Sequence, residues 1–245
     1  MPQTCRYTLR LAETEKDVRL AQVFRAGQFD CGTPDIDSFD AHCRHVLIES
    51  PDTGEIQACF RFLHFANSAC IDKSYSAQFY DLSRLQGFGR PLLEIGRFCV
   101  REGGRDFAVH RMAWAFLTRY VDAHGIALMF GCSSFVNTDA VEYTPAFALL
   151  KQRHLAPPNW MPGIKSPEVF KFADRLRDAN PDMKAANRTM PPLLRTYLGM
   201  GGWVSDHAVV DHAMNTLHVF TGVEVDAIPA PRVRLLRKDA GLLGA

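Results

Sequence analysis

The chain has 245 residues, of which 47% are hydrophobic, and its 28 basic residues nearly balance its 27 acidic ones. This length and composition suffice for a substantial buried core, in one domain with extensions. The net charge of +1 argues against a global electrostatic attraction to nucleic acid or membrane, but it permits a local basic patch. No apolar run reaches the roughly 20 residues of a membrane span, and residues 1–6 lack the apolar region of a signal peptide, so we expect a cytoplasmic protein.

The seven cysteines are scattered without CxxC spacing, which is typical of reduced thiols in a cytosolic protein. His42, Cys43 and His45 lie close together, but their spacing fits no common zinc motif and has no second half. The sequence therefore predicts neither a metal site nor a resident cofactor.

The amino-terminal third predicts a strand, a helix and a β-hairpin, in that order. Residues 7–11 alternate as a short strand, and residues 14–29 form a helix with one apolar face made of Leu20, Val23, Phe24 and Gly27. A turn rich in Gly, Pro and Asp follows at residues 32–40. A Pro-Asp-Thr-Gly turn then joins two antiparallel strands, residues 46–49 and 56–65.

The rest of the chain alternates strands with helices. Residues 92–100 form an apolar strand, and a helix begins at Phe107 with a core-facing side formed by Val109, Met112, Ala113, Phe116, Leu117 and Tyr120. A strand at residues 126–132 and short helical pieces up to about residue 178 come next. A helix at 191–200 precedes strands at 203–209 and 216–225. This mixture predicts an α/β or α+β fold.

Two charged residues interrupt the strand at 92–100. Burial of Glu94 and Arg97 in an apolar run is unfavourable unless the charges are paired or used in function. Residues three apart on a regular strand face opposite sides, but a bulge near Gly96 would bring them to one side and open the strand for a ligand. A structural ion pair remains the alternative.

Two further segments could bind charged ligands. The loop before the second helix carries Gly103, Gly104 and Arg105, and a helix amino terminus attracts anions; the alternative is a tight surface turn. The acidic residues between Asp35 and Asp40 could hold a substrate ammonium, or they are solvated turn residues.

With these segments in view, the chain resembles the L-ornithine Nα-acyltransferases of bacterial ornithine-lipid synthesis. That family is related to the GNAT acyltransferases and to the acyl-homoserine-lactone synthases. The resemblance covers nearly the whole chain, and it is carried by an ordered set of segments at residues 39–49, 93–100, 128–135, 155–160, 191–198 and 210–216.

The resemblance implies a fold of the α/β (α+β) class. It has a GNAT-like mixed central sheet, flanked by helices and split between the strand ending at Val100 and the strand beginning at Ile126, with the acyl-pantetheine arm in the split. It also implies a single acyltransferase domain over residues 1–245. Its core would cover about 5–150, with a family-specific helical and strand extension at about 151–228 and a basic tail at 229–245.

The resemblance also implies the reaction: a 3-hydroxyacyl group passes from acyl carrier protein to the α-amine of L-ornithine or a related amino acid, giving a lyso-ornithine lipid. Acyl-phosphopantetheine on the carrier is then a co-substrate. Catalytic roles fall on Glu94, as general base, and on Arg97. The implied substrate-binding residues are Arg25, Phe29, Asp37, Asp40 and Arg61. The implied residues for the acyl donor and its carrier are Cys99, Val100, Arg101, Gly104, Arg105 and Ser133.

Two regions bear on the substrates. Ala26-Gly27 replaces an aromatic–basic pair expected after Arg25, and residues 28–33 are shortened, so glutamine, glycine or another amine could replace ornithine. In coenzyme-A-using GNAT enzymes the loop before the helix is a glycine-rich pyrophosphate cradle. Here Asp106-Phe107-Ala108 occupies the later glycine positions, which favours an acyl carrier protein as donor.

Other interpretations remain open at this point. The Glu-Ile-Gly-Arg-Phe run also resembles the lactone synthases, which lack counterparts of residues 155–160 and 191–216, and a non-catalytic carrier-binding or lipid-binding module is a third reading. Basic residues interleaved with leucines from Arg232 to Lys238 suit an anionic inner-membrane surface, or form a solvated frayed tail. Nucleic acid is not an expected partner.

Overall fold

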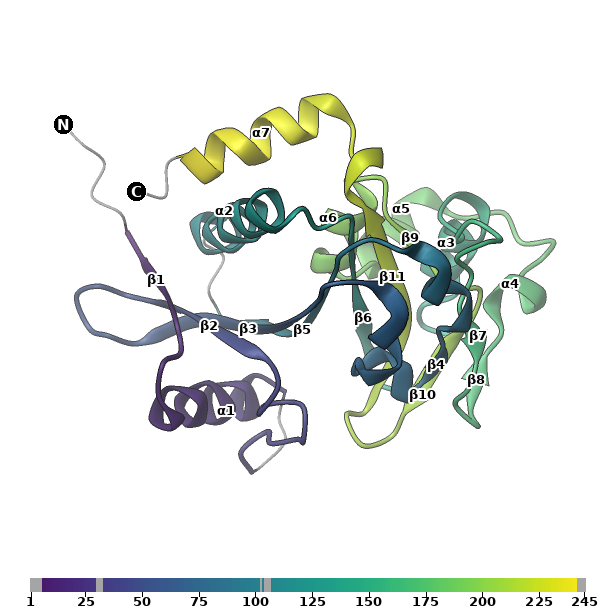
Figure 1. Ribbon diagram of the computed structural model, residues 1–245. Helices are drawn as coiled ribbons and strands as arrows, with labels where there is room; N and C mark the ends of the chain where they lie inside the picture. The colour runs from purple at the N-terminus through teal and green to yellow at the C-terminus, as the bar shows by residue number, and fades with distance from the viewer. Residues whose placement is uncertain (1–5, 30–32, 102, 104–106, 242–245) are drawn as a thin grey trace. The chain divides into compact units, whose positions relative to one another are not determined.

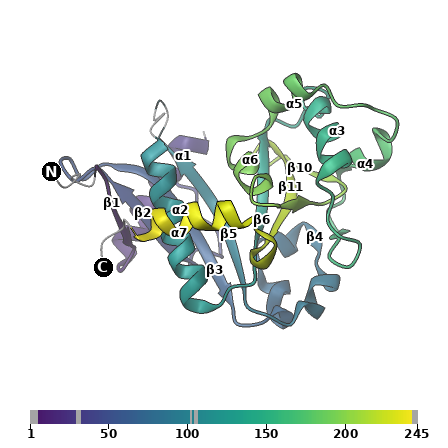
Figure 2. The same ribbon diagram turned by 90° about the horizontal axis from the view of Figure 1, so that it is seen from above.

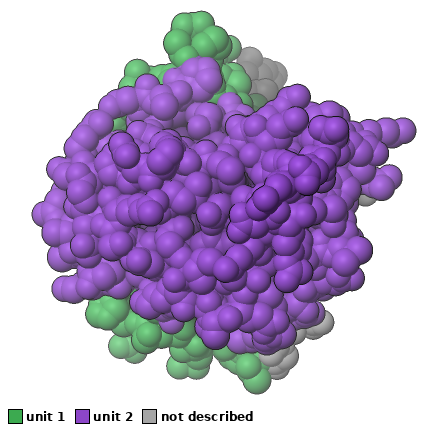
Figure 3. All heavy atoms as spheres, turned by 90° about the vertical axis from the view of Figure 1, so that its right-hand side faces the viewer, with its two compact units in different colours: residues 1–63, 95–125, 230–245 green, residues 64–94, 126–229 purple. Residues whose placement is uncertain are grey.

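The computed structural model describes residues 6–29, 33–101, 103 and 107–241. The chain forms two compact units, which Figure 3 colours separately. Unit 1 comprises residues 1–63, 95–125 and 230–245, and unit 2 comprises residues 64–94 and 126–229. Among the described residues, no helix combines the length and the apolar character needed to cross a bilayer.

Unit 1 is a sheet with a helix on each face (Figure 1). Strand β1 (Thr8–Leu11) pairs with β2 (Arg44–Glu49), β2 pairs with β3 (Ile56–Phe65), both antiparallel, and β5 (Leu92–Val100) is the next neighbour of β3. The predicted strands and hairpin are therefore confirmed. Alternate residues of β3 and β5 turn cysteine and arginine side chains to one face and phenylalanines to the other.

Helix α1 (Glu15–Phe29) begins where the sequence predicts, but it buries a different face. The hydroxyl of Thr14 accepts a hydrogen bond from the Asp17 backbone N–H, and the Asp17 carboxylate accepts one from the Thr14 N–H, which caps the helix. Leu20 and Val23, expected on the apolar face, are 42% and 55% exposed. The buried side chains are instead Ala21, Gln22 and Arg25, because carboxylates neutralise Arg25 inside the unit.

Helix α2 (Phe107–His124) is buried on more than one side. Its predicted core face is confirmed: Phe116 and Tyr120 pack on the Phe62 ring, with centroids 5.9 and 4.7 Å away. Trp114 lies outside that face and is also buried. The covering layer is helix α7 (Ala230–Gly241), which packs on α2 and crosses it in Figure 2. Residues 230–241 of the basic tail thus form a docked helix and not a frayed segment.

Unit 2 contains further strands of the mixed sheet. Its strands follow the order β5, β6 (Leu128–Val136), β11 (Thr216–Glu224), β10 (Ala208–Asp211), β8 (Val169–Phe170). Strand β6 is antiparallel to β11 along its whole length, whereas it is parallel to β5 only from Leu92 to Glu94. The predicted α/β (α+β) class, with a mixed sheet flanked by helices, is confirmed, and most of the strand pairs are antiparallel.

The predicted strand at 203–209 is divided in two. Trp203 and Val204 form β9, which pairs with β11, and the chain then bends before β10 begins. The hydroxyl of Ser205 explains the division, because it accepts a hydrogen bond from the Phe220 N–H at 3.1 Å and donates to the His207 carbonyl at 2.7 Å. A side chain thereby replaces a backbone partner between the strands.

Helices cover one face of the unit 2 sheet. Helices α3 (Thr144–Arg153), α4 (Phe172–Arg175), α5 (Met183–Thr189) and α6 (Pro192–Leu198) enclose a core that includes Phe147, Leu150, Phe172, Leu194, Leu217 and Val219. The alternate residues of β11 face a different layer. That layer contains the 3₁₀ helices η1 (Ser68–Lys73), η2 (Ser76–Gln78) and η3 (Ser83–Phe88), and the short pair β4 (Tyr80–Asp81) and β7 (Gly163–Ile164). A fourth 3₁₀ helix, η4 (Val225–Ala227), follows β11.

Candidate active site

Unit 1 contains a buried network of six charged side chains. Arg25 on α1, Arg61 on β3 and Arg97 on β5 face three aspartates from the segment between α1 and β2, namely Asp35, Asp37 and Asp40. Arg25 and Arg61 are only 1% and 2% exposed. Three positive charges balance three negative ones, which makes their burial tolerable.

Asp40 lies at the centre of the network. Its carboxylate accepts hydrogen bonds from Arg25 Nη2 at 3.0 Å, Arg61 Nη1 at 2.6 Å and Gln22 Nε2 at 2.9 Å. Burial alone would raise the pKa of Asp40, but hydrogen bonding and charge from Arg25, aided by Gln22 and Arg61, lower that pKa to about 2. Asp40 is therefore ionised at neutral pH and holds two elements of the unit together.

Asp35 and Asp37 connect the same segment to β5. Arg61 binds both oxygens of Asp37, at 2.6 and 2.7 Å, and Arg97 Nη2 donates to Asp37 at 3.1 Å. Arg97 Nε and Arg25 Nε both donate to Asp35 Oδ2, at 2.9 and 2.8 Å. Asp37 has the most exposed side chain of the three aspartates, at 23%.

His45 completes the network as a neutral group. Its Nε2 lies 3.0 Å from the Asp40 carbonyl oxygen and its Nδ1 lies 3.5 Å from Arg25 Nη1. These contacts assign the proton to Nε2 and an acceptor role to Nδ1. Burial lowers the pKa of His45, which favours the neutral form of the ring.

The backbone of β5 departs from regular geometry at Arg97. Arg97 has a φ of 53°, in the left-handed region that non-glycine residues rarely adopt. The irregularity predicted near Gly96 thus lies one residue further along the strand. Such a conformation costs about 1–3 kcal/mol, and the ion pairs of Arg97 with Asp35 and Asp37 help to stabilise it.

Glu94 is buried in unit 2 and has different partners from Arg97. Its Oε1 accepts hydrogen bonds from the Ser76 N–H at 2.7 Å and the Ser76 hydroxyl at 2.6 Å, and its Oε2 accepts one from the Tyr75 N–H at 2.9 Å. Only 4% of Glu94 is exposed. An ionised carboxylate, which only accepts, matches these three donors.

The residues expected to bind the acyl donor have varied environments. Cys99 is buried, with its Sγ 3.6 Å from Cys59 Sγ, and the contact with Cys59 together with burial raises the pKa of Cys99. The guanidinium of Arg101 donates to the Ile56 carbonyl at 2.7 and 2.9 Å, and Val100 beside it is half-buried. The buried Ser133 hydroxyl accepts from Thr221 at 2.9 Å.

Three more residues were predicted to bind the acyl donor or the acceptor. Gly104 and Arg105 lie outside the described residues. Phe29 packs at the end of α1 against the cluster that contains Cys59 and Cys99. The donor-binding and substrate-binding roles of all these residues stay predictions.

Sequence reasoning missed two partners of the buried charges. Gln22 lies one helical turn before Arg25, so its place on the same face was readable from the spacing once Arg25 was known to be buried. Ser76 precedes Glu94 by 18 residues in a segment without periodicity, and no signal in the sequence pointed to it.

Comparison with known proteins identifies the family. Residues 19–115 match the family model of the acetyltransferase (GNAT) domain. The L-ornithine N(alpha)-acyltransferase of Rhodobacter capsulatus is 33% identical over 239 residues, covering 91% of each chain. The chain belongs to the L-ornithine N(alpha)-acyltransferase family.

Other relatives agree with this membership. The family member from Brucella abortus is 30% identical over 203 residues, 79% of this chain and 71% of the relative. The protein is therefore an N-acyltransferase, which excludes the non-catalytic module. The solved structure of FeeM, an N-acyl amino acid synthase from uncultured soil microbes, shares the fold with a TM-score of 0.51 at 11% identity, covering 98% of this chain and 99% of the other. For this acyltransferase, the GNAT match spans the network of unit 1 and both charged residues of β5.

Proposed function

We propose that this acyltransferase transfers a 3-hydroxyacyl group from acyl carrier protein to the α-amine of L-ornithine, giving a lyso-ornithine lipid. The names of the relatives support ornithine as the acceptor. The observation that carries the chemistry is Glu94, a carboxylate held by three hydrogen-bond donors on a strand within the GNAT match.

The reaction requires one proton to be removed before the bond forms. An α-ammonium has no lone pair, so it must lose a proton before its nitrogen attacks the thioester carbonyl carbon. The C–N bond then forms, the attached nitrogen gives up a second proton, and the C–S bond breaks. The pantetheine sulfur takes up one proton and leaves as a thiol, so that one proton is released overall. We assign the removal of the ammonium proton to Glu94, directly or through a water molecule.

The network of unit 1 supports a role in acceptor binding. Asp40 is surrounded by Arg25, Arg61 and Gln22, so its role is to fix the positions of the arginines rather than to receive a substrate cation. Asp37 is also bound by Arg61 and Arg97, but 23% of its side chain is exposed, so it is the better candidate for contact with the ammonium groups of ornithine. Asp37→Asn should raise the KM for the amino acid more than the KM for the acyl donor.

Product analysis by mass spectrometry tests the proposed reaction. The full chain is incubated with 3-hydroxyacyl carrier protein and, in separate reactions, ornithine, glutamine and glycine. We expect N-acylornithine as the main product. A preference for glutamine or glycine would overturn ornithine as the acceptor.

A further inference from the structure

The groups that donate hydrogen bonds to Glu94 belong to one turn of the chain. The other side of that turn is bound by a segment that is distant in the sequence. This turn, called the η2 turn here, comprises residues 74–79 and includes η2. Inside it, the Ser74 hydroxyl accepts a hydrogen bond from the Ala77 N–H at 3.2 Å. Tyr75 and Ser76 donate to Glu94, while the carbonyl of Ala77 is left to accept from another segment.

Lys165 provides the donor for that carbonyl. Its Nζ lies 2.6 Å from the Ala77 oxygen. The residues on either side of Lys165 hold the same region through the backbone, because β7 pairs with β4 and the Ser166 N–H donates to the Phe79 carbonyl at 3.0 Å. Residues 163–166 therefore support the end of the η2 turn with one ammonium and several backbone hydrogen bonds.

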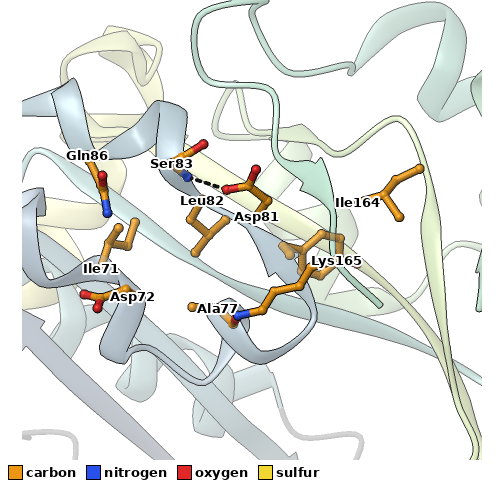
Figure 4. Close-up of a pocket in the computed structure, with 10 residues that line it drawn as sticks. Ile71, Asp72, Ala77, Asp81, Leu82, Ser83, Gln86, Ile164 and Lys165 are labelled. Carbon is orange, nitrogen blue, oxygen red and sulfur yellow. Dashed lines mark hydrogen bonds between the residues drawn. The ribbon is translucent and has the colours of Figure 1, made fainter. Parts of the chain in front are cut away.

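A cavity of about 390 Å³ adjoins this contact. Figure 4 shows the Lys165 side chain extending along the cavity to Ala77, with Asp81, Ser83 and Gln86 also on the wall. Because the stem of Lys165 borders open space, a substitution there removes the ammonium contact without leaving a hole in a packed core. The effect on Glu94 of losing the Lys165 contact can thus be tested without disturbing the packing of unit 2.

We propose that Lys165 is a positioning residue for Glu94 and acts through Ala77 and the η2 turn. The inference rests on the proposed role of Glu94 as the base. A base must lie at hydrogen-bond distance from the proton it removes, and a displacement of about 1 Å can lower the rate about 100-fold. Lys165 lies in the segment 151–228, so the carboxy-terminal extension contributes to the acyl-transfer step.

The test compares Lys165→Met with Lys151→Met. Lys151 makes the same kind of contact in the same unit, from its Nζ to the Leu176 carbonyl at 2.9 Å, but it supports a different segment. Lys165→Met should lower kcat about 5- to 50-fold and change both KM values less than about 2-fold, since it displaces the base and leaves binding intact. Lys165→Arg, which keeps a charged donor, should restore most of the rate, and Lys151→Met should resemble the wild type.

Two further measurements keep the test decisive. If Lys165→Met lowers the melting temperature, Ser76→Ala is assayed instead, because it removes a direct donor to Glu94 and should produce the same selective loss of kcat. In a Glu94→Gln background, Lys165→Met should cause no further loss of rate, because it acts only through Glu94.

Equal kcat values for Lys165→Met and Lys151→Met, or a full additional loss in the Glu94→Gln background, would overturn the inference. All rates are measured with whichever amine the wild type acylates. Failure of ornithine as the acceptor is therefore distinguishable from failure of Lys165 as a positioning residue.

Discussion

Two buried carboxylates, Glu94 and Asp40, are stabilised by different groups and therefore suit different tasks. The donors to Asp40 include two guanidinium groups, and its pKa of about 2 makes it a very weak base. The donors to Glu94 from the η2 turn are two backbone N–H groups and a hydroxyl, which orient the carboxylate without adding charge. Of the two, Glu94 is the better placed to remove a proton.

Replacement of Glu94 by Gln should lower kcat far more than it lowers stability. Loss of a general base typically lowers the rate about 10²- to 10⁴-fold. The amide nitrogen of Gln would face one of three donors, which should lower the free energy of unfolding by about 1–3 kcal/mol. Turnover is measured by release of free thiol, and thermal melts show how much of the variant is folded. Near wild-type turnover in a folded variant would exclude the base role.

The burial of His218 leads us to expect that the protein is less stable at acidic pH. Its side chain is 2% exposed on β11, and burial lowers its pKa from 6.5 to about 4. The unfolded chain therefore takes up this proton at a higher pH than the folded chain. The stability from neutral His218 is fully present above pH 6.5 and is lost as the pH falls from 6.5 towards 4, a loss of up to about 3 kcal/mol.

The change His218→Phe should remove this part of the acid sensitivity. Tyr80 donates to the backbone carbonyl of residue 218 at 2.8 Å, so its hydroxyl keeps a partner in the variant. Nε2 of His218 has no hydrogen-bond partner among the described residues, so loss of the ring nitrogen leaves no new buried polar group without a partner. Urea melts between pH 7 and pH 4 should show a smaller decrease for the variant. An unchanged decrease would mean that His218 does not titrate in this range.

At the scale of elements, the sequence predicted the helices and strands that are defined by a local pattern of residues. The mainly apolar run at 92–100 coincides with β5, and the period of 3.6 residues located α2. The buried face of α1 could not be predicted, because Arg25 is buried only by virtue of Asp35 and Asp40, which are 10 and 15 residues away. The 3₁₀ helices between residues 68 and 88 lack periodicity and were missed, and with them the η2 turn.

Helix α7 should bind anionic membranes through its outer face. Arg234, Leu235 and Lys238 are exposed, whereas Leu236 and Ala240 are buried at its inner side. Because the inner side is packed, removal of α7 would expose core residues, so charge reversal is the cleaner change. Each basic residue contributes about 1 kcal/mol near anionic lipid. Arg234→Glu combined with Lys238→Glu should therefore weaken co-sedimentation with anionic vesicles about 10-fold or more.

The matched control reverses two exposed charges on another helix, with Lys184→Glu and Arg188→Glu on α5. This control should co-sediment like the wild type, and neither protein should bind vesicles of neutral lipid. Equal binding by both double variants would show that α7 is not the membrane-contacting element.

At the scale of the whole molecule, positive charge is concentrated in one pair of helices. Helices α2 and α7 carry six basic and two acidic residues between them, a net charge of +4. The whole chain has a net charge of only +1, so the remaining residues carry −3. A concentration of charge of this kind speeds association with an acidic protein and makes that association sensitive to salt.

The charge distribution therefore predicts a strong preference for an acyl carrier protein over acyl-coenzyme A. Phe107 is the first residue of α2, and we expect its side chain to hinder a glycine-type coenzyme A cradle. We therefore expect binding to depend more on the carrier than on the phosphates of the arm. The kcat/KM with the acyl carrier should decrease steeply as salt is raised, whereas the weak activity with the matching acyl-coenzyme A should change less.

Arg111→Glu combined with Arg119→Glu tests the surface on α2 directly. Both residues are exposed, and Arg111 also forms a surface ion pair with Asp239 of α7 at 3.5 Å, so thermal melts must first show that the double variant is folded. The reversal should lower kcat/KM for the acyl carrier by about 10-fold or more. The loss should be in KM, because the chemical step is unchanged once the thioester is bound. The α5 double variant again serves as the control. Comparable kcat/KM values for the two donors, with no effect of salt, would show that the carrier itself contributes nothing to recognition, since the acyl-pantetheine arm is common to both.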